Sequence, residues 1–121
     1  MTKSPNSKPY DLEDRTARFA KGVRELIKQI KKTIGNIEDG KQVIRSSGSV
    51  GANYIEANEA LSKKDFAHRV KISRKEARES EYWLRLLDIQ NVNNLKKEQE
   101  GLIGESVELI KIFSAIINKT R

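Results

Sequence analysis

Apolar residues recur every three or four positions along four long stretches of the chain, with polar residues between them. This spacing places the apolar side chains on one face of an α-helix, whose turn takes 3.6 residues. In the first stretch Phe19, Val23 and Leu26 share such a face. The sequence has no sustained alternation of period two, which is the pattern of a half-buried strand. The predicted helices span residues 11–34, 36–61, 62–89 and 95–119.

Residues that start and stop helices separate these stretches. Asp11 is the expected N-cap of the first helix. Gly35 is expected to end that helix, because glycine adopts the left-handed conformation common there, and Asn36 would then cap the second helix. Ser62 begins a Ser-Lys-Lys-Asp sequence, in which the serine hydroxyl accepts a hydrogen bond from the third amide of the helix. The asparagine-rich cluster at 91–94 predicts the last turn.

Connections this short make successive helices run antiparallel. The sequence therefore predicts an all-α fold, an antiparallel up-down-up-down four-helix bundle made by residues 10–121. Residues 1–9 are polar, contain both prolines of the chain, and are predicted to form a disordered N-terminal tail. A chain of 121 residues is long enough for one such domain with its own hydrophobic core.

The stretch from Arg45 to Ala60 combines helical periodicity with many small residues. Gly48 and Gly51 would each destabilise a helix by up to about 1 kcal/mol relative to alanine. We expect them to be helix-packing residues that let a neighbouring helix come close. Charged residues on inner helix faces must be paired. We therefore expect one polar network between the second and third helices, formed by Arg45, Asn53, Glu56, Lys75, Glu76 and Glu79.

The fourth predicted helix carries two apolar stripes instead of one. The first comprises Ile103, Val107, Ile110 and Ile117, and the second Leu102, Leu109, Ile112, Phe113 and Ile116. A bundle helix needs an apolar stripe of only about 100° toward its own core. The surplus predicts self-association, and a single wide core stripe is the alternative interpretation.

The net charge of +7 is concentrated in residues 1–34 and 62–90. Cations gather opposite the apolar face of the first helix and form a second row on the third. These candidate nucleic-acid-binding residues are Arg18, Lys21, Arg24, Lys28, Lys31, Lys32, Lys71, Arg74, Arg78 and Arg85. Such rows bind phosphates in some proteins and are merely solvated in others. Tyr82 and Trp83 could stack on bases, although core packing is the favoured interpretation for both.

Few residues could support catalysis. The chain has no cysteine and a single histidine, His68. Asp65 and His68 have the spacing of half a di-metal carboxylate motif, but no second histidine completes it. Gly48 and Gly51 do not form a phosphate loop, because no strand precedes them. We therefore expect no enzyme activity, no bound metal and no cofactor.

The location of the protein is suggested by what the sequence lacks. The N-terminal residues have no apolar segment of a secretion signal, and no apolar run approaches the roughly 20 residues that a membrane span needs. Without cysteines there is also no sign of the disulfides of secreted domains. The expected location is the cytoplasm, with no membrane partner.

Three blocks of sequence carry a family resemblance. They are residues 45–57, Arg-Ser-Ser-Gly-Ser-Val-Gly-Ala-Asn-Tyr-Ile-Glu-Ala, residues 62–66, Ser-Lys-Lys-Asp-Phe, and residues 74–87, Arg-Lys-Glu-Ala-Arg-Glu-Ser-Glu-Tyr-Trp-Leu-Arg-Leu-Leu. Together with the opening Tyr-Asp-Leu-Glu at 10–13, they resemble the bacterial four-helix-bundle proteins of the 23S rRNA intervening-sequence family.

The resemblance implies a ring-shaped homopentamer, encoded in some bacteria within insertions of large-subunit ribosomal RNA genes. That family is also similar to the accessory variability proteins of diversity-generating retroelements, which are basic pentameric bundles that act with a reverse transcriptase and nucleic acid. The resemblance supplies no catalytic residues.

Two functions remain open at this stage, together with a minor third. The leading hypothesis is a non-enzymatic homo-oligomer that binds nucleic acid, structured RNA or RNA/DNA, through its outward basic faces. The alternative is a protein-interaction scaffold or accessory subunit for a nucleic-acid enzyme, which binds no nucleic acid itself. The third, an enzyme with a carboxylate-bound metal, has the least support in the sequence.

Overall fold

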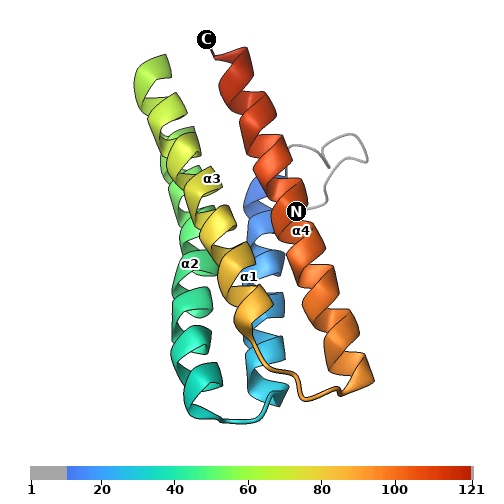
Figure 1. The fold of residues 1–121 in the computed structure, drawn as a ribbon. Coiled ribbons are helices and arrows are strands. Elements are labelled where there is room, and N and C mark those ends of the chain that lie inside the picture. The colour runs from blue at the N-terminus through green and yellow to red at the C-terminus, as the bar shows by residue number, and fades with distance from the viewer. Residues whose placement is uncertain (1–10, 121) are drawn as a thin grey trace.

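A computed structural model describes residues 11–120, which form four helices and no strand (Figure 1). The helices are α1 (Leu12–Gln29), α2 (Ile34–Asn58), α3 (Lys63–Leu86) and α4 (Asn93–Lys119). They run alternately down and up, and α1 packs against α2 and α4 while α3 packs against the same two helices. The predicted all-α, antiparallel four-helix bundle is therefore confirmed. The predicted N-terminal tail lies outside the described residues, and a single chain leaves the ring-like assembly a prediction.

The first helix ends five residues earlier than predicted. Ile30 is its C-cap, and Thr33 is the N-cap of α2, where its Oγ1 accepts a hydrogen bond from the backbone amide of Asn36 at 3.0 Å. Gly35 lies inside the first turn of α2, so the predicted glycine stop was wrong. The prediction overlooked threonine as a cap, although its hydroxyl can satisfy one of the free amides at a helix start.

Asn36 was predicted to cap the second helix, but it lies in the first turn of α2 and its side chain is buried. Its Nδ2 donates to the backbone carbonyls of Lys31 and Asp88 at 3.0 and 2.8 Å, and its Oδ1 accepts from the amide of Asp88 at 2.9 Å. Residues 31 and 88 belong to the two links at the same end of the bundle (Figure 1). Asn36 therefore ties these two links together.

The other helix ends agree more closely with the sequence. Ser62 caps α3, as its Oγ accepts from the amide of Asp65 at 3.1 Å. α3 ends at Leu86, about three residues earlier than predicted, and α4 begins two residues earlier. Gln90 and Asn91 lie in the link between α3 and α4. Their φ angles of 53° and 61° reverse the direction of the chain there. The predicted turn is therefore confirmed, and it starts slightly before the asparagine cluster.

The two predicted packing glycines behave differently. A Cβ on Gly51 would lie 2.7 Å from Oγ1 and 3.1 Å from Cβ of Thr16, so α1 approaches α2 closely only because this residue is glycine. A Cβ on Gly48 would meet only the Arg24 guanidinium, at an ordinary 3.6 Å. The packing role is therefore confirmed for Gly51, and Gly48 is not needed for the helices to touch.

The inner seam between α2 and α3 is made by small hydroxyl side chains. Ser46 and Ser80 are fully buried with their Oγ atoms 2.8 Å apart. Ser73, also fully buried, donates to the carbonyl of Val50 at 2.8 Å. These bonds satisfy the hydroxyls where a larger side chain would push the helices apart.

The surplus of exposed apolar surface that was predicted on α4 is mostly absent. All nine residues of its two stripes are buried or half-buried, because α4 packs against both α1 and α3. The alternative, one wide core stripe, describes this helix in the single chain. Exposed large apolar residues lie elsewhere: Ile34, Ile37, Ile55, Leu61, Tyr82, Leu86 and Val92. Within residues 11–120, no helix combines the length and apolarity needed to cross a membrane.

Candidate nucleic-acid interface

The cations predicted on the third helix lie along the outer side of α3. Lys71, Arg78 and Arg85 are exposed. Arg74 is half-buried, and its Nη1 donates to Ser114 Oγ on α4 at 3.2 Å. Arg85 Nη2 lies 2.8 Å from the Glu81 carboxylate one turn back. The row is therefore on the surface, but Arg74 links two helices and is less available than the others.

Tyr82 lies in the middle of this row and is 57% exposed. It follows Arg78 by four residues and precedes Arg85 by three, so all three side chains leave the same face of the helix. The predicted core role is wrong for Tyr82, and it holds for Trp83, which is half-buried and packs against the core. The two rings meet edge to face, with centroids 5.0 Å apart and an angle of 71° between their planes.

We call this surface the α3 basic face. It comprises Lys71, Lys75, Arg78, Tyr82 and Arg85, which succeed one another at spacings of four and three residues. The nearby carboxylates Glu79 and Glu81 each pair with an arginine, so they reduce the positive charge without reversing it. The α3 basic face therefore combines cations with an accessible aromatic ring.

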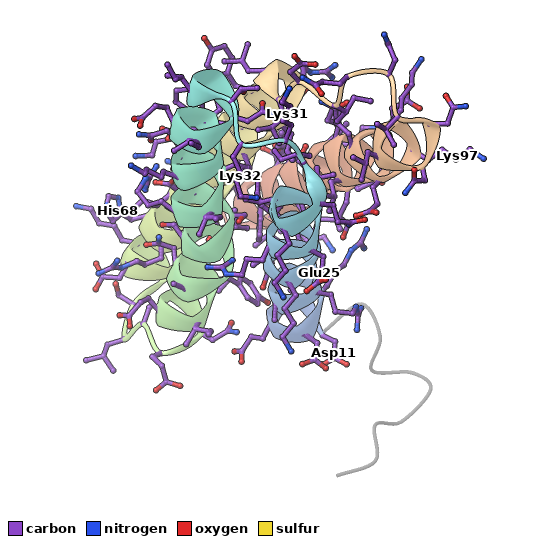
Figure 2. All side chains as sticks on the ribbon, turned by 90° about the horizontal axis from the view of Figure 1, so that it is seen from below. Asp11, Glu25, Lys31, Lys32, His68 and Lys97 are labelled. Atoms are coloured by element: carbon purple, nitrogen blue, oxygen red, sulfur yellow. The ribbon has the colours of Figure 1, made fainter. Side chains whose placement is uncertain are left out.

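The cations predicted on the first helix form a second exposed group. Arg18, Lys21, Arg24 and Lys28 are exposed on α1, whereas Lys31 and Lys32 lie beyond its end in the link to α2 (Figure 2). They therefore do not form one continuous helical row, as the longer predicted helix had implied.

Lys28 and Lys32 have partners that reduce their availability. Lys28 Nζ pairs with the Glu25 carboxylate at 3.0 Å. Lys32 Nζ donates to the carbonyls of Ile27 and Ile30 at 3.4 Å each, which satisfies free carbonyls at the end of α1. Lys32 therefore has a structural role besides any binding role.

Four of the six residues predicted to form one polar network do meet. Arg45 Nη2 lies 3.2 Å from Glu76 Oε1 and 3.0 Å from Glu79 Oε1, and Lys75 Nζ lies 3.6 Å from Glu76 Oε2. Glu76 is buried, with a relative exposure of 5%. A buried carboxylate is tolerated when cations accompany it, so this cluster is structural.

Asn53 and Glu56 do not join the network, and that part of the prediction was wrong. Asn53 donates to Ser49 and accepts from Arg69 Nη1 at 3.2 Å, while Glu56 is exposed. The reason is the antiparallel register of α2 and α3. A residue two turns further along α2 faces a residue two turns earlier in α3, so Asn53 lies opposite Arg69, far from Glu76.

One inter-helix ion pair was not anticipated from the sequence. Arg15 on α1 makes two hydrogen bonds to the Glu105 carboxylate on α4, at 2.7 and 2.9 Å. The hydrogen bonding to Glu105 raises the pKa of Arg15 above its ordinary value. Nothing in the local pattern pairs these positions, which are 90 residues apart, until the order of the helices around the bundle is known.

The region around His68 provides little for catalysis. His68 is exposed and shares a shallow hollow with Glu56, Glu59 and Asp65 at the end of the bundle. In the described part of the chain, no three or more His, Cys, Asp or Glu side chains are grouped so that they could hold a metal ion.

The fold and the surface define the class: an all-α four-helix bundle with outward basic faces. A family model described as "23S rRNA-intervening sequence protein" matches residues 9–115, and the chain belongs to this family. The chain is also similar to a crystallised protein with unknown function from the S23 ribosomal protein family of Bacteroides thetaiotaomicron. The two share 35% sequence identity, with a TM-score of 0.73, over 87% of this chain and 96% of that one. No match is found among curated proteins.

Proposed function

We propose that this protein is a non-enzymatic, cytoplasmic homo-oligomer that binds nucleic acid, with structured RNA as the preferred ligand. The observation that carries the proposal is the exposed Tyr82 ring within the cations of the α3 basic face. Cations alone are common on protein surfaces and are usually solvated. An exposed aromatic side chain among them adds a surface on which a base can stack.

The two kinds of group would contact different parts of the ligand. Lys71 and Arg78 would contact phosphates, which gives affinity that depends on salt and little on sequence. Tyr82 would stack on an unpaired base, an interaction worth about 1–3 kcal/mol. Bases in a regular duplex are already stacked, so this arrangement favours loops, bulges and single strands. The remaining cations of α1 strengthen the field that attracts the ligand.

The family description refers to an intervening sequence of 23S rRNA and names no ligand, so the choice of ligand rests on the α3 basic face. Neither that description nor the crystallised neighbour names an enzymatic activity. The proposal also includes self-assembly, with a homopentamer as the resemblance implies. Light scattering on purified protein measures that mass directly, and a monomer at micromolar concentration would overturn the assembly.

The test of nucleic-acid binding uses an RNA hairpin with an unpaired loop and a blunt duplex with the same number of phosphates. Tyr82→Ala should weaken binding to the hairpin about tenfold, given the stacking energy above, and leave the salt dependence unchanged. The double variant Lys71→Gln/Arg78→Gln should lower the slope of log Kd against log salt for both ligands, by about 0.7–0.9 for each phosphate that the protein no longer neutralises. Trp83 is the sole tryptophan and its ring meets that of Tyr82, so its fluorescence reports occupation of this face.

Lys97→Gln is the matched control, because Lys97 is an exposed lysine on α4 away from the α3 basic face. It should leave both affinities unchanged. Tyr82→Trp should retain binding, because it keeps a ring that can stack. Failure of the unaltered protein to bind either RNA at low salt would overturn the proposed function. Binding that both Tyr82→Ala and Lys71→Gln/Arg78→Gln leave unchanged would remove the assignment to this face.

A further inference from the structure

A groove runs along the bundle between α1 and α2, on the side of the α1 cations. It consists of successive hollows with volumes of about 190, 610 and 250 Å³. The first two share Ile27, Lys32 and Ile44, so they are continuous. The third lies further along the same helix pair, over Gly48 and Gly51.

The floor of the groove is apolar because small residues leave it unfilled. Ala17, Ala20, Gly48 and Ala52 contribute almost no side chain at one end, and half-buried Ile27 and Ile44 form the floor of the middle. Ile37 and Ile55 are 40% and 47% exposed, and they mark the two ends of the groove on α2. An apolar strip of this kind, crossed only by the Arg24 guanidinium, is a candidate contact surface for another molecule.

The rim of the groove is positively charged. Lys21, Arg24, Lys28 and Lys32 line the largest hollow, with Glu25 as the single acidic residue there. The Arg24 Nη1 atom donates to the carbonyl of Ala20 at 3.1 Å, and its Nη2 lies 3.6 Å from where a Cβ on Gly48 would be. The arginine therefore lies across the groove, in space that Gly48 leaves free.

We propose that this groove docks an acidic amphipathic helix of a partner protein. The apolar face of that helix would cover Ile27 and Ile44, and its flanking carboxylates would pair with Lys21 and Lys28. The stretch of α2 between Ile37 and Ile55 rises about 27 Å at 1.5 Å per residue, which matches a helix of about five turns. Helix-in-groove recognition uses the same combination of apolar anchors and charged flanks.

The chemistry of the groove argues against the two other occupants. A nucleic acid would have to lay charged phosphates over isoleucine side chains, which costs solvation without compensation. A second copy of this chain carries a net charge of +7, so the cationic rim of the groove favours an acidic partner over it. The proposal is independent of nucleic-acid binding, which is assigned to the α3 basic face.

The probe for the test is a synthetic 18-residue peptide with leucines at helical spacing and glutamates flanking them, labelled with fluorescein. We expect it to bind the full-length protein by fluorescence anisotropy and to become helical on binding. A peptide of the same composition in permuted order is the control and should bind at least tenfold more weakly. A version with lysine in place of glutamate should also bind at least tenfold more weakly.

Three protein variants locate the site. Gly48→Leu fills the groove without removing a core side chain, and Lys21→Glu/Lys28→Glu reverses the charge of these two rim positions. Each variant should weaken peptide binding at least tenfold. Lys97→Glu, on α4 away from the groove, should leave it unchanged (Figure 2). Circular dichroism and the unfolding midpoint establish that each variant is folded.

Several results would overturn the proposal. Equal binding of the permuted peptide, or binding that both groove variants leave unchanged, would remove the site. A fall in particle mass on Gly48→Leu would mean that a second copy covers the groove. Displacement of the peptide by the RNA hairpin, together with loss of hairpin binding in Gly48→Leu, would assign the groove to nucleic acid. Tyr82→Ala should weaken RNA binding and leave peptide binding unchanged. Failure of the groove proposal is therefore distinguishable from failure of the proposed function.

Discussion

Two glycines one turn apart on α2 have opposite relations to their surroundings. Gly51 faces Thr16, whose buried hydroxyl donates to the carbonyl of Leu12 at 2.7 Å and cannot move away freely. Gly48 faces the groove, where only the Arg24 guanidinium is near. The same residue type therefore permits close packing in one case and leaves a surface open in the other.

Gly51→Ala should destabilise the protein by about 1–3 kcal/mol, because the new methyl group must displace Thr16 and with it α1. Gly48→Ala is the matched control at the same kind of helical site. It should stabilise the fold by about 0.5–1 kcal/mol, because alanine restricts the unfolded chain and fits the helix. Urea unfolding measures both changes. Equal losses at the two positions would contradict the packing difference.

Residue-scale features were only partly predictable. The capping serine at 62 follows a strong local pattern and was found from sequence. The role of Asn36 was not, because its three hydrogen bonds reach Lys31 and Asp88, and the second of these is 52 residues away. A buried amide and an exposed capping amide look the same in one sequence. What distinguishes them is their tertiary surroundings.

At the scale of the helices, the antiparallel register of α2 and α3 decides which polar residues meet. Arg45 faces Glu79, Val50 faces Ser73, and Asn53 faces Arg69. The polar faces of both helices could be read from periodicity. The position of one helix along the other could not be read in this way, because apolar periodicity alone fits several alignments that differ by one turn. This is why four members of the network were predicted correctly and two were not.

The pair between Arg45 and Glu76 should be energetically coupled. In a double-mutant cycle, Arg45→Met and Glu76→Gln should show a coupling free energy of about 1 kcal/mol or more, because the buried Glu76 carboxylate then loses the closer of its two cationic partners. The control cycle uses Lys41→Met and Glu38→Gln, an ion pair of 3.6 Å with both side chains largely exposed. Its coupling should be about 0–0.5 kcal/mol. A coupling no larger in the first cycle than in the second would contradict the assigned role.

For the whole molecule, the bundle is held together unevenly around its circumference. α2 and α3 pack most closely, while α1 and α4 touch least. Between these last two, the Arg15–Glu105 ion pair and a hydrogen bond from Gln29 to Glu98 supply polar interactions. The side between α1 and α4 is therefore the one where the bundle should open most easily.

Arg15→Gln should loosen the bundle mainly on this side. Backbone amides of α1 and of the facing part of α4 should exchange with deuterium several-fold faster, while those in the middle of α2 and α3 should be nearly unaffected. Hydrogen exchange read by mass spectrometry separates these helices. Arg18→Gln, an exposed change on the same helix, is the control and should not alter exchange. Uniform acceleration over all four helices would indicate global unfolding instead.

The charged surfaces were predictable in kind but not in arrangement. Net charge and periodicity placed cations on the outer sides of α1 and α3. They did not place Tyr82 on the surface, because periodicity alone does not show how far the neighbouring helices cover each side of α3. The groove between α1 and α2 could not be predicted from the sequence either, because its floor depends on how close the two helices come at Gly48 and Gly51.

The register of α2 and α3 has a consequence for how this chain can change in length. Inserting one residue between Ser46 and Val50 would rotate the rest of α2 by about 100° against α3 and separate every later pair. The six-residue link between Leu86 and Asn93 has no such constraint. Homologues should therefore keep a fixed number of residues between the two buried serine pairings and should vary in length mainly in that link.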